Sequence, residues 1–178
     1  MSGSPPFSSF YDVANLPEKG ADLAISPGTD ERAQIAAWLE IQSLGGLKAS
    51  IKLTRSPSGF RYRAQFEADV VQASVVSLEA VPAHLSGDFE RSYQLAPSPS
   101  RAARKRNEPP VVALNPEDED APELVDSTMF DLAAPILEEL SLALDPYPRK
   151  AGEAFIPPEP AENAPNTPFA ILKKLKES

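Results

Sequence analysis

A long alternation of apolar and polar residues is the feature that most limits the fold of this chain. Apolar residues stand at every second position over residues 47–53 and again over residues 60–70, with a Ser-Pro-Ser-Gly turn between the two runs. Such a period is typical of strands, and so short a link joins antiparallel neighbours. We therefore predict a twisted antiparallel meander with one solvated and one covered face. A third strand over residues 85–95 continues the alternation through Leu85, Phe89, Tyr93 and Leu95.

The N-terminal residues predict the elements that precede this meander. Two short apolar-rich runs, residues 7–14 and 21–25, flank a turn and predict a first strand pair. Thr29 is suited to cap a helix that covers the sheet, and Gly45-Gly46 is expected to end that helix. The predicted apolar face of the helix consists of Ile35, Trp38 and Leu39.

A second, amphipathic helix is predicted from Asp131 to Leu144. Asp131 can serve as its N-cap, and Pro135 falls in the first turn, where a missing amide costs little. Pro146 then biases the chain away from helical dihedrals, so an extended, partly exposed Pro-Tyr-Pro-Arg strip follows at residues 146–149. The apolar stripe of this helix is formed by Leu132, Ile136, Leu137, Leu140, Ala143 and Leu144.

Two segments without periodicity interrupt the pattern. Residues 97–122 hold Ser-Pro repeats, a basic cluster and an acidic cluster, and predict a flexible insertion. Residues 151–178 predict a proline-rich tail that ends in a short helix. The expected fold is a single α+β domain over residues 1–150, with a twisted antiparallel sheet of about five strands covered by two helices.

Composition removes most kinds of catalytic and metal site. The 178 residues include no cysteine and a single histidine, His84, so we expect no metal site and no cofactor. A formal net charge of -9 opposes broad attraction to nucleic acid, and any basic patch must be local. The sequence lacks an apolar run that could span a bilayer and lacks a secretory signal, which predicts a cytoplasmic protein.

Three motifs occur in one order along the chain: residues 72–81, the second helix with its exit up to Arg149, and the closing segment Thr167 to Lys176. In this order and spacing they resemble the YceD family of large ribosomal RNA accumulation proteins. Many members of that family have Cys-x-x-Cys where this chain has Ser74 and Ser77. Serine hydroxyls are poor metal ligands, so we expect no metal or redox chemistry at these two positions.

The resemblance implies a non-enzymatic factor in large ribosomal subunit biogenesis, which supports synthesis, processing or accumulation of 23S rRNA. Its partner would be the large-subunit precursor, through rRNA or a ribosomal protein. The residues leave open a generic protein-binding adaptor not tied to ribosomes, and a hydrolase or nuclease based on carboxylates. For the latter, Glu138 and Glu139 point about 100° apart on a helix and cannot act on one bond together.

Two surfaces are candidates for binding a partner. A rigid exposed aromatic and an arginine lose little entropy on binding, and the first surface consists of Tyr147, Pro148 and Arg149. The second joins an apolar stripe to a basic edge on the terminal helix: Phe169, Leu172, Lys173, Lys174, Leu175 and Lys176. Each of the two could instead close the fold. The basic cluster within residues 101–106 lacks aromatics for base stacking and is a weaker candidate.

Overall fold

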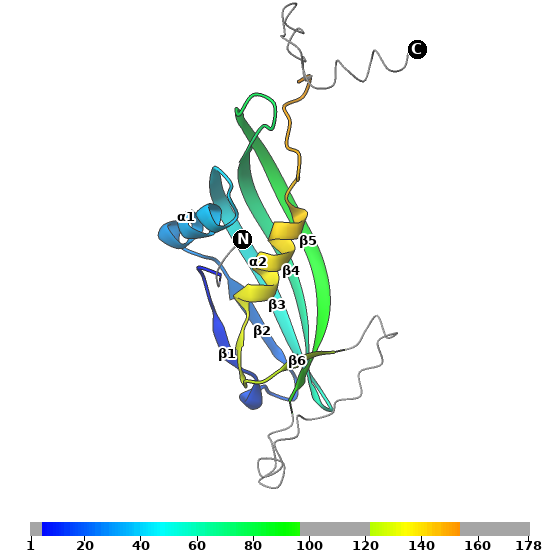
Figure 1. The fold of residues 1–178 in the computed structure, drawn as a ribbon. Coiled ribbons are helices and arrows are strands. Elements are labelled where there is room, and N and C mark those ends of the chain that lie inside the picture. The colour runs from blue at the N-terminus through cyan, green and yellow to red at the C-terminus, as the bar shows by residue number, and fades with distance from the viewer. Residues whose placement is uncertain (1–4, 97–121, 154–178) are drawn as a thin grey trace, which may run out of the picture.

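The computed structural model describes residues 5–96 and 122–153 (Figure 1). Its main sheet has the strand order β2-β3-β4-β5-β6, and a second sheet pairs β1 with β7. The arrangement confirms the predicted α+β fold, with a five-stranded sheet and two α-helices. The strands are β1 (Phe10–Asp12), β2 (Ala21–Ile25), β3 (Ser43–Ser56), β4 (Gly59–Ala73), β5 (Ala80–Leu95), β6 (Glu123–Val125) and β7 (Met129–Asp131). The helices are the 3-10 helix η1 (Val13–Asn15), α1 (Thr29–Trp38) and α2 (Ala133–Ala143).

The alternation in β3 and β4 gives the sheet its two faces. These strands form the predicted antiparallel hairpin, with Ser56 opposite Gly59 across the turn. A slip of one residue would move every side chain to the other face, so burial of one face fixes this register. The side chains of β4 on the covered face are at most 4% exposed: Phe60, Tyr62, Ala64, Phe66, Ala68 and Val70.

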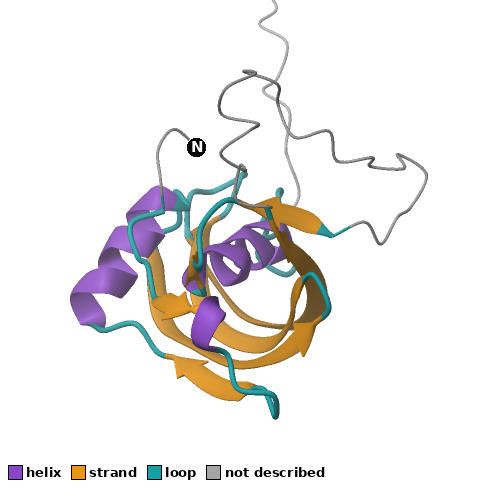
Figure 2. Cartoon of the chain, turned by 90° about the horizontal axis from the view of Figure 1, so that it is seen from below, coloured by secondary structure: helices purple, strands orange, loops and turns teal. Residues whose placement is uncertain are grey.

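The sheet curves around α2, which lies on its concave side (Figure 2). Ile136, Leu137 and Leu140 of this helix are at most 1% exposed. Full burial of such side chains contributes roughly 1.5–3 kcal/mol each. The predicted stripe therefore faces the sheet, although Ala143 at its end is exposed.

Aromatic side chains lie beneath the start of α2. The ring centroids of Tyr93 and Phe130 are 4.6 Å apart, and those of Phe60 and Phe130 are 4.9 Å apart. The Tyr62 hydroxyl donates to the carbonyl of Leu132 at 2.8 Å. Burial raises the pKa of Tyr62 well above its ordinary value, so the hydroxyl keeps the proton that this bond requires.

Both α-helices begin one residue away from their predicted caps. Leu132 rather than Asp131 is the N-cap of α2, because Asp131 still belongs to β7. The Asp131 carboxylate nevertheless accepts the amide of Ala133 at 3.0 Å. It therefore satisfies a donor of the first turn, as the sequence predicted. For α1 the N-cap is Gly28 rather than Thr29.

One predicted strand pairing and one predicted helix end are wrong. The runs at residues 7–14 and 21–25 do not pair with each other, because β2 forms five residue pairs with β3, whereas β1 joins β7 beside the start of α2. Gly45-Gly46 does not end α1, which stops at Trp38 and turns at Glu40, with φ 57°. The glycines lie in β3, where the register of its pairing with β4 shifts between Leu44 and Gly46.

The strands after β4 also differ in detail from the expectation. β5 begins at Ala80, five residues earlier than the alternation indicates. The short strand β6 runs parallel to β5, so the sheet is mixed. Most of the predicted insertion and tail lies outside the described residues, and the division into one domain and a tail stays a prediction. Neither α1 nor α2 is long and apolar enough to cross a membrane.

Candidate binding surface

The exit of α2 is held against the turn between β4 and β5. The Asp145 carboxylate accepts the amide of Tyr147 at 2.8 Å, and the Asp145 carbonyl accepts the side-chain amide of Gln72 at 2.9 Å. Further along, the amide of Val75 donates to the carbonyl of Pro148 at 2.9 Å. Backbone and side-chain bonds therefore fix the extended strip that the prolines predicted.

We call residues 74–79 and 145–153 together the tip. Within the strip, Tyr147 is 70% exposed and Arg149 is also exposed, whereas Pro148 is buried. The proline thus anchors the strip, and its two neighbours point to solvent. The tip brings Tyr147 into the same region as two exposed apolar side chains of the turn, Val75 and Leu78.

The turn is built around Ser74, whose side chain is fully buried. Its hydroxyl accepts the amides of Val76 and Ser77 at 3.1 and 3.3 Å, and its carbonyl accepts the amide of Leu78 at 3.0 Å. Leu78 has a φ of 62° and is 75% exposed. A left-handed conformation costs a residue with a side chain about 1–2 kcal/mol, and such strain is concentrated at functional sites.

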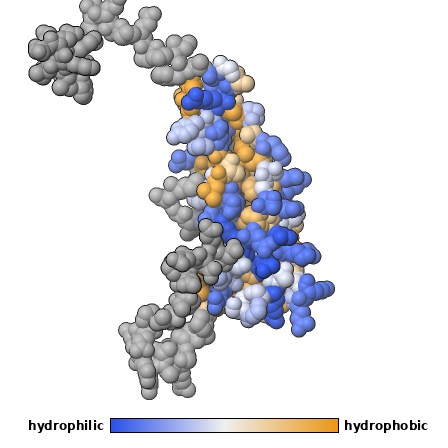
Figure 3. All heavy atoms as spheres, turned by 90° about the vertical axis from the view of Figure 1, so that its right-hand side faces the viewer, coloured by the Kyte–Doolittle hydropathy of each residue, from blue (hydrophilic) through white to orange (hydrophobic). Residues whose placement is uncertain are grey.

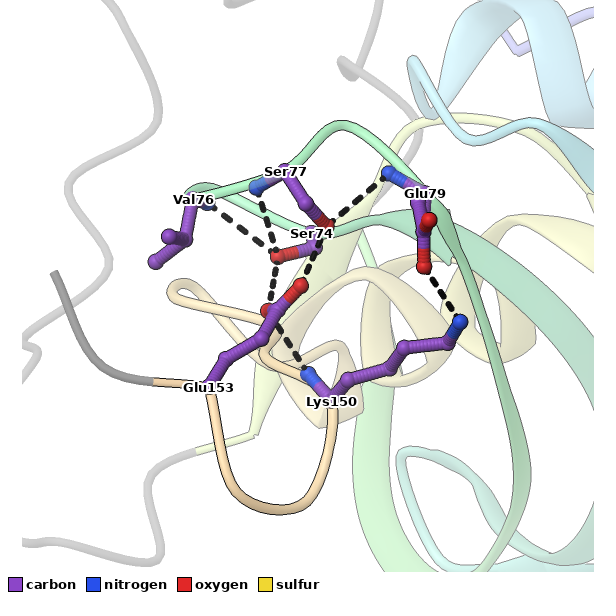
Figure 4. A network of polar contacts seen from close by, with 6 residues as sticks. All are labelled: Ser74, Val76, Ser77, Glu79, Lys150 and Glu153. Atoms are coloured by element: carbon purple, nitrogen blue, oxygen red, sulfur yellow. Dashed lines mark hydrogen bonds and ion pairs between the residues drawn. The ribbon is translucent and has the colours of Figure 1, made fainter.

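Glu153 ties the end of the strip to this turn (Figure 4). One carboxylate oxygen accepts the Ser74 hydroxyl and the amide of Lys150, and the other accepts the Ser77 hydroxyl. The Lys150 ammonium forms an ion pair with Glu79. Three segments of chain, residues 74–77, Glu79 and residues 150–153, are thereby joined through polar groups.

These contacts favour the charged forms of the groups involved. The hydroxyls of Ser74 and then Ser77 lower the pKa of Glu153 below its ordinary value. The hydrogen bond to Glu79 raises the pKa of Lys150. Both groups are therefore ionised near neutral pH, and the positive charge of Lys150 lies between the negative charges of Glu79 and Glu153.

The two serines lie at the turn between β4 and β5, and Glu153 was not predicted as their partner. Nothing in the sequence links Glu153 to Ser74 and Ser77, because it lies beyond the strip in a low-complexity run. The described residues contain no group of three carboxylate or histidine side chains that could hold a metal ion. The absence of a metal site from the whole chain stays a prediction.

Other candidate residues fall into two groups. The terminal stripe from Phe169 to Lys176 and the basic cluster at residues 101–106 lie outside the described residues. The neighbours Glu138 and Glu139 are described, and both accept from the guanidinium of Arg91 at 2.6 Å, one on each terminal nitrogen. They diverge on the helix as expected, and the width of one guanidinium spans them.

His84, the single histidine, pairs with a carboxylate of the neighbouring strand. Its Nδ1 lies 2.8 Å from the Asp69 carboxylate, on the exposed face of the sheet. This hydrogen bond raises the pKa of His84. The pair is a cross-strand contact, because Asp69 and His84 are opposite each other in the pairing of β4 with β5.

Comparison with known proteins gives one match. A family model described as large ribosomal RNA subunit accumulation protein YceD matches residues 62–176, a span that includes most of β4, the tip and the closing segment. The chain has no match among curated proteins or solved structures. Because the matched span is more than half of the chain, the comparison confirms the resemblance: the chain belongs to the YceD family of large ribosomal RNA subunit accumulation proteins.

Proposed function

We propose that this chain is a non-enzymatic cytoplasmic factor in large ribosomal subunit biogenesis that supports accumulation of 23S rRNA. It does so by binding the large-subunit precursor. Family membership supports the process, and the tip supports the mode of action. The observation that carries the proposal is an exposed Tyr147 and Arg149 on a strip whose intervening Pro148 is buried and hydrogen-bonded.

A surface of this kind suits binding because its backbone is already ordered. Immobilising a rotamer-rich side chain costs about 0.5–1.5 kcal/mol, and loop ordering adds to that cost. In the tip, Asp145, Pro148 and Glu153 already hold the backbone. Tyrosine and arginine are frequent anchors of interfaces, because both combine apolar area with hydrogen-bond donors.

The closing segment is the second part of the proposed surface. The described chain ends at Glu153, within the tip, so the segment from Phe169 to Lys176 is tethered there. Its Lys173, Lys174 and Lys176 supply local positive charge on a chain of net charge -9. Local charge favours phosphates at one site without the indiscriminate binding of a wholly basic protein.

Contacts within the protein occupy several of the described carboxylates that a hydrolase or nuclease could use. Glu138 and Glu139 are bound to Arg91, and Glu90 contacts both Arg61 and Arg63 at 3.0 and 2.8 Å. Glu153 is occupied by two hydroxyls and an amide. A general base or a metal ligand needs a free oxygen aimed at the substrate or ion.

The test uses cells that lack the wild-type protein. We compare a double variant, Tyr147→Ala with Arg149→Ala, a truncation after Asn166, and the control Phe10→Ala. Phe10 is an aromatic of similar exposure, 63%, on β1 and away from the tip (Figure 1). The measurements are 23S rRNA level, large-subunit content, and thermal unfolding of each purified variant.

We expect the double variant and the truncation to keep their unfolding temperature and to lose complementation, while Phe10→Ala complements. Full complementation by both would place the working surface elsewhere. Unfolding of both would show that these residues close the core. Normal 23S rRNA in cells without any copy of the protein would contradict the function itself rather than the surface.

A further inference from the structure

One edge of β5 is open over most of its length. Residues Ala80 to Gln94 of β5 pair with β4, but only Tyr93 to Leu95 pair with β6 on the other side. Among the described residues, no strand pairs with that second edge between Ala80 and Ser92. A strand edge of this length presents a row of backbone donors and acceptors that another chain can use.

The direction of each backbone group along β5 follows from two hydrogen bonds. The amide of Leu95 donates to the carbonyl of Ser58 on the β4 side, and the amide of Ala96 donates to Val125, beside β6. Amides alternate between the two sides of a strand, and the pairing with β4 has no register shift. The residues whose N–H groups face the side away from β4 are therefore His84, Ser86, Asp88, Glu90 and Ser92, and the first four also present their C=O groups to the open edge.

Pro82 provides an independent check on this assignment. Its position is separated from those residues by an even number of steps, so its nitrogen faces the same side of β5. Proline has no N–H to give to a neighbouring strand. Proline is tolerated in a sheet where its nitrogen faces an open edge. Its place in β5 thus agrees with the assignment. Because Pro82 offers no donor, a partner strand would lack one backbone hydrogen bond at that end.

An apolar strip runs along the concave side of the same edge. The side chains of β5 that point to this side are only partly buried, in contrast to those of β4: Val81, Ala83, Leu85 and Phe89. On α2, Glu138 and Glu139 face β5 because both bind Arg91, and Leu142 follows Glu138 by one turn on the same side. Leu142 is 72% exposed. Figure 3 looks toward this side of the molecule and shows hydrophobic atoms in a band beside hydrophilic ones.

The charges around the edge select the kind of partner. Arg91 contacts three carboxylates, those of Glu123, Glu138 and Glu139, which leaves a local excess of two negative charges. On the convex side, Asp88 projects from the middle of the open stretch. A basic segment would find complementary charge on both sides of the edge.

We propose that the open edge of β5 is a docking site for an extended, basic peptide segment of a partner protein, which adds as a strand with apolar side chains at alternate positions. Its backbone bonds to the five edge residues, and its apolar side chains cover Leu85, Phe89 and Leu142. Strand addition gives affinity through main-chain bonds and selectivity through alternate side chains. A second copy of this chain fits less well, since it would bring one acidic rim against another. The proposal does not depend on the tip or on ribosomes.

The probe is the peptide acetyl-Lys-Val-Lys-Val-Lys-Val-Lys-Val-Lys-amide, titrated into the isotope-labelled full chain and followed by NMR. We expect saturable shifts and slower amide exchange at His84, Ser86, Asp88, Glu90 and Ser92. A peptide of the same sequence with alternate amides N-methylated should fail to bind, although the protein is unchanged. The Glu-Val counterpart should bind at least tenfold more weakly, and about 0.5 M salt should weaken the Lys-Val peptide.

Ser86→Pro removes one edge donor and leaves the ladder with β4 intact, so it should weaken the peptide about tenfold or more. Ser86→Thr keeps the amide and is the matched control. Shifts confined to the tip, or equal binding of the N-methylated peptide, would overturn the proposal. So would self-association that Ser86→Pro abolishes, which would identify a second copy as the occupant. Tighter peptide binding after deletion of residues 99–119 would identify the chain's own insertion as the occupant of the edge, and it would also overturn the proposal.

Discussion

At its start, α2 is held by a buried hydrogen bond, whereas at its exit it is held by hydrogen bonds that are exposed or partly buried. The Tyr62 hydroxyl meets the Leu132 carbonyl inside the aromatic cluster, away from water. At the other end, Asp145 and Glu153 bind backbone and hydroxyl donors at the surface. A buried polar group that loses its partner costs free energy for which water cannot substitute, whereas an exposed group finds water instead.

This contrast separates two tasks within one helix. The start fixes α2 in the concave side of the sheet, so it determines whether the fold exists. The exit fixes the course of the strip that carries Tyr147 and Arg149, so it determines what the proposed binding surface presents. Changes at the start should lower global stability, and changes at the exit should alter the local order of the tip with little global effect.

The largest effect is expected for Ile136→Ala, in the first half of α2. Ile136 is 1% exposed, so the substitution removes buried methyl groups and leaves a cavity. The expected loss of unfolding free energy is about 2–5 kcal/mol, measured by denaturant titration. Leu142→Ala near the exit, where 72% of the side chain is exposed, should change it by less than about 0.5 kcal/mol. Equal losses would remove the contrast between the two ends.

The next effect is expected for Tyr62→Phe, which deletes only the hydroxyl. The carbonyl of Leu132 then loses its bond to Tyr62. A loss of about 1–3 kcal/mol should follow in the same titration. Tyr147→Phe is the matched control, because its side chain is 70% exposed and its hydroxyl can bond to water. A neutral result for Tyr62→Phe would mean that water or a rearranged backbone satisfies the carbonyl.

How much of this was visible in the sequence differs between the two ends. The start was largely predictable, because the stripe from Leu132 to Leu140 and the alternation of β4 each define a buried face, and two such faces pack together. The exit was predictable only as a stiff strip, from Pro146 and Pro148. Its partners were not, because local patterns carry no information on which distant residues meet.

The same limit explains the other misses. Arg91 lies far in sequence from Glu138 and Glu139, and nothing in the pattern of β5 singles it out. The parallel strand β6 has three residues, too few for a period to show. The alternation of β5 was visible, but alternation indicates which side chains share a face and not whether another element covers them. The open edge therefore emerged only from the topology.

A smaller effect is expected for Ser74→Ala in the tip. The buried hydroxyl accepts the amides of Val76 and Ser77 and donates to Glu153. The groups that lose these hydrogen bonds in the variant are only partly buried. We expect a loss of about 0.5–1.5 kcal/mol in unfolding free energy. Amide exchange should quicken at residues 76–78 and stay unchanged in the middle of α2. Faster exchange throughout α2 would show that the exit also supports the fold.

The smallest effect is the response of the tip to acid. The pKa of Glu153 is lowered by the hydroxyls of Ser74 and Ser77, so its folded value lies below 4.5, the ordinary value. A carboxylate with a depressed pKa contributes stability that is present above the unfolded pKa and is lost as the pH falls through the folded one. From pH 5 downward, we therefore expect the amide resonances of Ser77 and Lys150 to shift with one titration midpoint below 4.5, before any global unfolding. Glu153→Gln keeps an acceptor oxygen but cannot titrate, so it should abolish this step while the mid-helix amide of Ile136 stays unchanged in both proteins. A midpoint above 4.5, or a step that persists in Glu153→Gln, would show that another group governs the tip.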